Sequence, residues 1–127
     1  MKTFITGGTG LLGNNLVRQL VKRGDKVKVL VRSREKAKRV LGDLPVTIIQ
    51  GDMENIGAFK EELRGCDTLY HLAAYFREYY GPGKHWEKLK RINVDKVIEL
   101  FNAAKEMKVQ NILFVGSGGI IRQSEGQ

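Results

Sequence analysis

Residues 3–13 read Thr3-Phe4-Ile5-Thr6-Gly7-Gly8-Thr9-Gly10-Leu11-Leu12-Gly13, an apolar run followed by a glycine-rich stretch that opens a helical pattern. This order predicts a strand that turns sharply into a helix. Gly7 permits the tight turn, Gly10 lets a diphosphate approach the backbone, and Gly13 lets the helix pack closely on the strand. The unpaired amides of the first helical turn then favour an anionic ligand. The stretch predicts a dinucleotide-binding turn, and the alternative is a glycine-rich connection without a ligand.

The composition is that of one ordinary soluble domain. The chain has 127 residues, of which 42% are hydrophobic and 28% charged, and a chain of this size can bury a real core. It has neither the ~18-residue apolar run of a membrane span nor a signal-peptide pattern, so we expect a cytoplasmic protein without membrane contact. Cys66 is the only cysteine, which fits a reducing compartment. The net charge of +8 favours a phosphate-bearing partner.

Alternating apolar segments predict five strands separated by helices. The strands are expected at 3–6, 26–31, 46–50, 67–71 and 112–115, and the helices at 12–24, 34–41, 56–63 and 86–108. Strict alternation with short links implies parallel strands joined by right-handed crossovers. The predicted fold is therefore α/β, a doubly wound parallel sheet in strand order 3-2-1-4-5. Residues 1–119 form the predicted dinucleotide-binding domain and 120–127 a tail.

The predicted fold brings several polar residues to one edge of the sheet. Ligands of doubly wound sheets collect beyond the carboxyl ends of the strands, at the reversal between the first and fourth strands. The glycine stretch, Arg32, Asp52, His71 and Ser117 all fall at this edge. Their convergence predicts one ligand site.

These residues resemble motifs of the extended short-chain dehydrogenase/reductase family, which includes nucleotide-sugar epimerases, dehydratases and dihydroflavonol-type reductases. Residues 6–13 resemble its TGxxGxxG motif, and Gly51-Asp52 resembles its adenine-side acid. The run 71–74, His-Leu-Ala-Ala, is similar to its alanine-rich loop, and Asn93 to its structural asparagine. Gly116-Ser117 falls where the family has a serine pair, although Gly116, Gly118 and Gly119 depart from the expected residues.

The resemblance implies a Rossmann-type domain whose intact enzyme transfers hydride between a nicotinamide cofactor and the carbonyl or carbinol carbon of a small-molecule substrate. It also implies that Ser117 is a catalytic residue that hydrogen-bonds a substrate oxygen. The chain looks like the N-terminal part of such an enzyme, truncated before its remaining strands and substrate domain. The family's tyrosine and lysine acid/base pair is missing, because the formal match Tyr80 to Lys84 contains two glycines and a proline, which preclude a helical turn.

Three site residues have a competing structural interpretation. Asp52 either accepts a hydrogen bond from the adenine amino group or caps the following helix. His71 either lines the cofactor groove or ends a strand, and Ser117 is either the substrate contact or a plain loop serine. No second His or carboxylate stands at ligand spacing, so we expect no metal site.

The end of the second strand decides the choice of nucleotide, because the adenosine ribose rests there. An acidic residue at that end would repel a 2′-phosphate, whereas this strand ends in Arg32-Ser33-Arg34. Arg32, with Arg34 or Lys36, can bind a 2′-phosphate, which predicts NADP(H) in preference to NAD(H). Asp25 precedes the strand and lies at the wrong edge of the sheet. The alternative is a solvated basic helix face.

The predicted cofactor contacts combine the residues of the resemblance with the two arginines. They are Thr6, Gly7, Gly8, Thr9, Gly10, Leu11, Leu12, Gly13, Arg32, Arg34, Asp52, Met53, Leu72, Ala73 and Ala74.

Other functions remain open at this point. One alternative is a non-catalytic NADP(H)-binding or redox-sensing module. A weaker one is nucleic-acid binding through Arg34, Lys36, Lys38 and Arg39, a basic face without an interleaved aromatic for base stacking. The apolar strand 112–115 has no evident following strand, so we expect either an edge that pairs with a second copy as a homodimer or the cut face of a longer enzyme.

Overall fold

A computed structural model of the chain describes residues 1–72, 95–116 and 119–124. The strands are β1 (Lys2–Thr6), β2 (Lys26–Val31), β3 (Thr47–Gln50), β4 (Thr68–Leu72), β5 (Asn111–Gly116) and β6 (Gly119–Ser124). The α-helices are α1 (Leu11–Arg23), α2 (Arg34–Leu41) and α4 (Lys96–Glu106), and two 3₁₀ segments are η1 (Met53–Ala58) and η2 (Lys60–Leu63).

The strands form one sheet in the order β3-β2-β1-β4-β5-β6. The first five are parallel, which confirms the predicted doubly wound arrangement and its strand order. Because β1 lies between β2 and β4, the chain direction across the sheet reverses beside the end of β1. The carboxyl ends of β1, β2 and β3 therefore meet at the edge where the glycine stretch begins.

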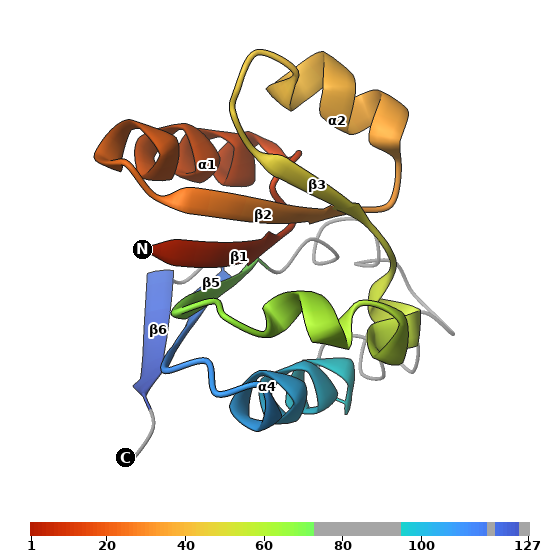
Figure 1. Cartoon of the computed structure of the whole chain (residues 1–127), viewed down its shortest axis with the longest axis vertical. Coiled ribbons are helices and arrows are strands. Elements are labelled where there is room, and N and C mark those ends of the chain that lie inside the picture. The colour runs from red at the N-terminus through yellow and green to blue at the C-terminus, as the bar shows by residue number, and fades with distance from the viewer. Residues whose placement is uncertain (73–94, 117–118, 125–127) are drawn as a thin grey trace, which may run out of the picture.

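Helices cover both faces of the sheet (Figure 1), with α1 and α2 on one face and the η segments with α4 on the other. Neighbouring residues of one strand accordingly enter different cores, as Phe4 and Ile5 do. Phe4 stacks on Phe59 of the η side at a ring-centroid distance of 5.9 Å. Burial on both faces explains why the inner strands read as continuous apolar runs in the sequence.

The helix predicted at 56–63 is a pair of 3₁₀ segments instead. Asn55 leaves helical geometry at φ −137° and ψ 70°, and Phe59 does so at φ −118° and ψ 0°. The apolar side chains that suggested a helix, Ile56, Phe59 and Leu63, are all buried in the core. Spacing of three and four residues fits a 3₁₀ turn as well as an α-turn, so the pattern located the buried face but not the helix type.

The prediction that nothing after the fifth strand could form a strand is wrong. β6 pairs antiparallel with β5, from Asn111 opposite Ser124 to Gly116 opposite Gly119. Only two residues separate the strands, a length typical of hairpins. Residues 120–124 of the predicted tail are therefore part of the sheet, and β5 is not an edge strand. On this side of the sheet, the edge that a second copy could use is β6 rather than β5.

The remaining boundaries agree closely with the sequence pattern. The second strand and the helix 34–41 are found at the predicted residues. Of the long helix predicted at 86–108, the structure describes Lys96–Glu106, and the earlier part lies outside the described residues. None of the helices in the described part of the chain is long and apolar enough to cross a membrane.

Candidate functional site

The glycine stretch after β1 is packed so tightly that it admits almost no side chains. Gly7 has φ +75°, and a Cβ there would lie 3.0 Å from Cβ of Leu72. A Cβ on Gly13 would lie 2.0 Å from the carbonyl oxygen of Gly7, and one on Gly8 would lie 2.5 Å from Val29 Cγ1. The turn and the close approach of α1 therefore depend on these glycines, as the sequence predicted.

Gly10 differs from the other three glycines, because the residues that the structure describes leave space beside it. The nearest atom to a Cβ at this position is the Gly7 carbonyl oxygen at 3.7 Å, an ordinary contact. Gly10 is the N-cap of α1, with no side-chain cap and no acidic residue in the first turn. The amides that begin α1 are thus uncapped by side chains beside an open position, an arrangement that suits an anion.

The ends of β1 and β4 are joined by a buried polar contact. Thr6 Oγ1 accepts a hydrogen bond from the backbone N–H of Leu72 at 3.3 Å and lies 2.6 Å from Nδ1 of His71. The His71 ring also contacts Phe101 and Phe114. Burial lowers the pKa of His71 to about 4, so the ring is neutral at pH 7. His71 thus sits in the sheet interior, with its ring held by neighbours.

The end of β2 carries two arginines beside the end of β3. Val31 pairs with Gln50 in the sheet, so Arg32 and Gln50 are neighbours. Ser33 caps α2 by accepting from the backbone N–H of Lys36 at 3.2 Å. Arg34, the first residue of α2, donates from Nε to Oε1 of Gln50 at 3.2 Å.

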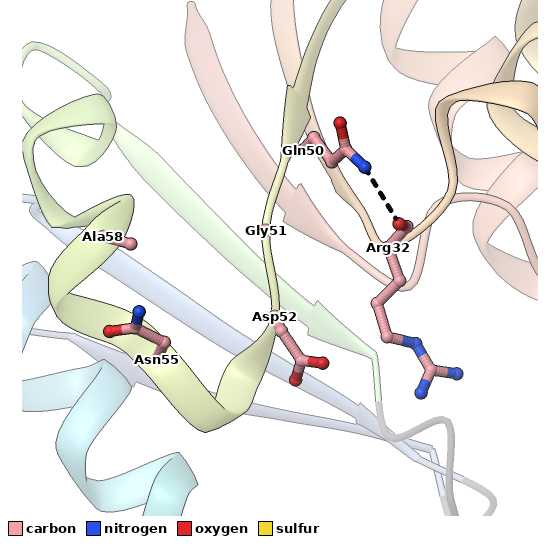
Figure 2. A pocket seen from close by; sticks show the side chains of 6 residues that line it. All are labelled: Arg32, Gln50, Gly51, Asp52, Asn55 and Ala58. Carbon is pink, nitrogen blue, oxygen red and sulfur yellow. Dashed lines mark hydrogen bonds between the residues drawn. The ribbon is translucent and has the colours of Figure 1, made fainter.

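A pocket of about 320 Å³ opens at these strand ends, lined by Arg32, Gln50, Gly51, Asp52, Asn55 and Ala58. Figure 2 shows the Arg32 and Asp52 side chains projecting into the same open space, one from the end of β2 and the other from the residue before η1. Asp52 Oδ1 accepts from the backbone N–H of Glu54 at 2.9 Å, so the capping interpretation of this carboxylate is confirmed. The same residue still lines the pocket.

Asp25 lies at the opposite, amino edge of the sheet, as the sequence indicated. Its carboxylate accepts two hydrogen bonds from Arg23, at 3.1 and 2.6 Å, and one from the Thr3 hydroxyl at 3.0 Å. The bonds from Arg23 hold the pKa of Asp25 below its ordinary value despite burial. This acid is part of the fold and does not face the carboxyl edge of the sheet, where the pocket lies.

The predicted cofactor residues divide into three groups. The glycines, Arg32, Arg34 and Asp52 surround the carboxyl edge of β1–β3. Met53 packs against the core on the η side, Leu72 is buried on the α1 side, and Leu12 is exposed in the first turn of α1. Thr6, Thr9 and Leu11 belong to the first group, at the turn from β1 into α1. The third group, Ala73 and Ala74, lies outside the described residues, as do Ser117, Asn93, Tyr80 and Lys84.

Sequence reasoning missed three residues that line the pocket, Gln50, Asn55 and Ala58. Gln50 had a usable signal, since it is the polar last residue of an apolar strand whose end faces the same edge. Asn55 and Ala58 are brought there by the 3₁₀ geometry of η1, which the helical pattern did not reveal. Among the described residues, no three His, Cys, Asp or Glu side chains gather as metal ligands would.

Comparison with known proteins gives a family for this chain. The model of the NAD dependent epimerase/dehydratase family matches residues 3–126. A ketoreductase of Stigmatella aurantiaca that acts on 4-hydroxy-2-methyl-3-oxo-4-farnesyl-3,4-dihydroquinoline-1-oxide is 36% identical over 123 residues, covering 95% of this chain and 35% of the relative. A putative dihydroflavonol 4-reductase of Synechocystis is 33% identical over 114 residues, covering 90% of this chain and 32% of that protein.

A solved structure supports the fold. The yeast methylglyoxal/isovaleraldehyde reductase Gre2, complexed with NADPH, superposes with a TM-score of 0.74 at 21% identity, over 90% of this chain and 36% of that protein. The chain thus spans about a third of the length of the relatives that it matches.

Proposed function

Because this chain belongs to the NAD dependent epimerase/dehydratase family, we propose that it binds NADP(H) across the carboxyl edge of β1–β3. The family relationship leaves the choice of coenzyme open, since the family description names NAD whereas the yeast reductase holds NADPH. The choice therefore has to be argued from the residues of this chain.

The diphosphate binds at the amino end of α1. The observation that carries this assignment is the contrast between Gly13, whose Cβ would overlap the backbone at 2.0 Å, and Gly10, which faces open space. Packing explains Gly13 but not Gly10. A ligand that approaches the backbone closely explains Gly10, and the uncapped amides of α1 supply hydrogen-bond donors and partial positive charge for it.

The adenosine half lies in the pocket between β2, β3 and η1. Arg32 and Arg34 hold the 2′-phosphate there, because both are exposed cations and β2 is followed directly by Arg32 rather than by an acidic residue. Asp52 lines the same pocket and faces the adenine. The predicted contacts of Ala73, Ala74 and Ser117 stay part of this proposal without a structural account.

The reaction of the full-length protein is hydride transfer between the nicotinamide and a carbonyl or carbinol carbon of a small molecule. The bound coenzyme supplies the hydride chemistry. The described residues of this chain bind and orient its adenosine and diphosphate groups. Reductases among the relatives support this class of reaction. We place the protein in the cytoplasm. We propose that two copies associate as a homodimer through the edge strand β6.

Charge reversal at the end of β2 tests the coenzyme preference. We expect Arg32→Asp to weaken NADPH binding by about tenfold or more while NADH binding changes little, since a charge-assisted bond contributes ~1.5–3 kcal/mol. Isothermal titration of both coenzymes into the purified chain measures the ratio. Lys38→Asp, an equal charge change on the exposed side of α2, is the matched control. An NADPH-to-NADH ratio that is the same in wild type and Arg32→Asp rules out Arg32 as the selector.

A further inference from the structure

Gln50, the last residue of β3, makes hydrogen bonds to both arginines of the proposed phosphate site. Its Oε1 accepts from Nε of Arg34 at 3.2 Å. Its Nε2 donates to the backbone carbonyl of Arg32 at 3.5 Å, the bond drawn in Figure 2. One amide side chain therefore connects the first residue after β2 with the first residue of α2.

The position of Gln50 follows from the sheet register. Val31 lies opposite Gln50, and the backbone N–H of Gly51 donates to the carbonyl of Val31 at 2.9 Å. The side-chain bond from Gln50 to Arg32 continues this contact by one residue beyond the end of β2. The main chain at Arg32 is thereby tied to β3 at the point where the chain turns from strand into helix.

The bond to Arg34 has a directional effect on the guanidinium group. Because Nε donates to Gln50, this hydrogen bond restrains the position of the guanidinium group and leaves its two terminal nitrogens to act as further donors. Within the described part of the chain, no partner is found for these terminal nitrogens. They are the pair of donors that a phosphate takes in a bidentate contact.

We infer that Gln50 is a specificity-determining residue, which orients Arg34 and the Arg32 backbone for the 2′-phosphate of NADP(H). The inference rests on the proposed function, because it assumes that the arginines receive this phosphate. An uncharged amide suits the role, since it accepts from an arginine without neutralising it. A carboxylate at the same place would accept equally well but would cancel the positive charge and repel the phosphate.

Two substitutions at this position separate geometry from charge. We expect Gln50→Leu, which removes both hydrogen bonds, to weaken NADPH binding about three- to tenfold and to leave NADH binding unchanged. We expect Gln50→Glu to lower the NADPH-to-NADH affinity ratio further, because the acceptor is kept while a negative charge is added. Isothermal titration of NADPH and NADH gives both affinities. Gln110→Leu, an exposed glutamine before β5, is the matched control.

The Arg34→Ala variant shows whether Gln50 acts through the arginine. If it does, Gln50→Leu reduces NADPH affinity less in the Arg34→Ala background than in wild type. Thermal unfolding of each variant checks that the fold is kept. A merely structural Gln50 would change stability, or both coenzyme affinities together, and would not change their ratio.

The outcomes distinguish this inference from the proposed function. If Arg32→Asp and Arg34→Ala both leave the affinity ratio unchanged, or if neither coenzyme binds, the phosphate site itself is wrong and the role of Gln50 falls with it. If the arginine variants lower the ratio and Gln50→Leu does not, the inference about Gln50 alone is overturned.

Discussion

At the scale of single residues, the glycines of the first turn carry different functions that their shared identity hides. Gly13 is required by the protein itself, because a Cβ would overlap the backbone of Gly7. No described atom lies closer than 3.7 Å to a Cβ built at Gly10, so the packing of the described residues does not require a glycine there. The sequence motif predicted a separate role for each, and the geometry bears out the packing role of Gly13.

Alanine at each position tests this separation. We expect Gly13→Ala to destabilise the fold by ~2–4 kcal/mol, because backbone atoms of the turn must move. We expect Gly10→Ala to keep the stability of the wild type and to weaken binding of NADPH and NADH alike, since its Cβ would meet the diphosphate. Urea unfolding and coenzyme titration provide the two measurements. Normal coenzyme affinity in Gly10→Ala would contradict the placement of the diphosphate at α1.

Sequence reasoning at this scale located the arginines and Asp52 but not the contacts between them. Arg32 and Arg34 were visible because the strand pattern ends at Val31. That Gln50 connects them depends on which residues of β2 and β3 are paired, and a single sequence does not give the register of two parallel strands joined by a helix. Long-range contacts of this kind explain most of what was missed.

At the scale of elements, prediction succeeded where the spacing of apolar residues has a single structural interpretation. The helix 34–41 was predicted to the residue because its apolar positions follow the helical period, and in the structure Ser33 caps it where the pattern begins. It failed at η1 and η2, where the buried positions fit two helix types, and at β6, where the apolar signal is limited to two residues, Ile120 and Ile121. Pairing with β5 forms that last strand, and tertiary contacts of this kind override local pattern.

Asp25 connects elements at the amino edge, and its removal is expected to weaken their junction. Its side chain is 3% exposed and binds Arg23 of α1 and Thr3 of β1. We expect Asp25→Ala to lower the free energy of unfolding at pH 7 by ~2–4 kcal/mol, because a buried hydroxyl and an arginine lose their acceptor. Urea unfolding measures the change.

The exposed pair of Arg18 and Asp43 is the control for Asp25. Its carboxylate is 68% exposed, so we expect Asp43→Ala to leave the stability nearly unchanged. If Asp25→Ala and Asp43→Ala lower the free energy of unfolding equally, burial of Asp25 contributes nothing to stability. Because the pKa of Asp25 is lowered in the fold, its contribution is present above the ordinary aspartate range and is lost as the pH falls through the folded pKa.

At the scale of the whole molecule, the sheet order was predictable because strict alternation leaves few topologies. The charge of +8 did not identify a partner, and the proposed coenzyme preference rests instead on the placement of two arginines at a strand end. The centre of the sheet, however, contains a titratable group whose effect extends to the entire fold. His71 is 5% exposed between β1 and α4.

His71 is expected to make the stability of the molecule depend on pH. Its pKa is about 4 in the fold and 6.5 in an unfolded chain, so the unfolded state takes up the proton first as the pH falls. The contribution of His71 to the free energy of unfolding is therefore fully present above pH 6.5. It decreases towards pH 4, with a slope of up to about 1.4 kcal/mol per pH unit. Urea unfolding between pH 7 and about 4.5 measures this slope.

His71→Asn supplies the comparison, since the amide can still bond to the Thr6 hydroxyl but does not titrate. The difference between the two stability curves isolates the histidine from the carboxylates that titrate at lower pH. Parallel curves for the two proteins would show that the ring does not remain neutral in the fold.

The pairing of Val31 with Gln50 has a consequence for coenzyme engineering. Two short, adjoining segments contain the side chains proposed to recognise the adenosine end: residues 31–36, from the end of β2 into α2, and residues 50–52, from the end of β3 to the start of η1. Transplanting these nine residues together should exchange coenzyme selectivity between family members as a unit, whereas grafting the arginines without their glutamine would transfer the charge but not its orientation.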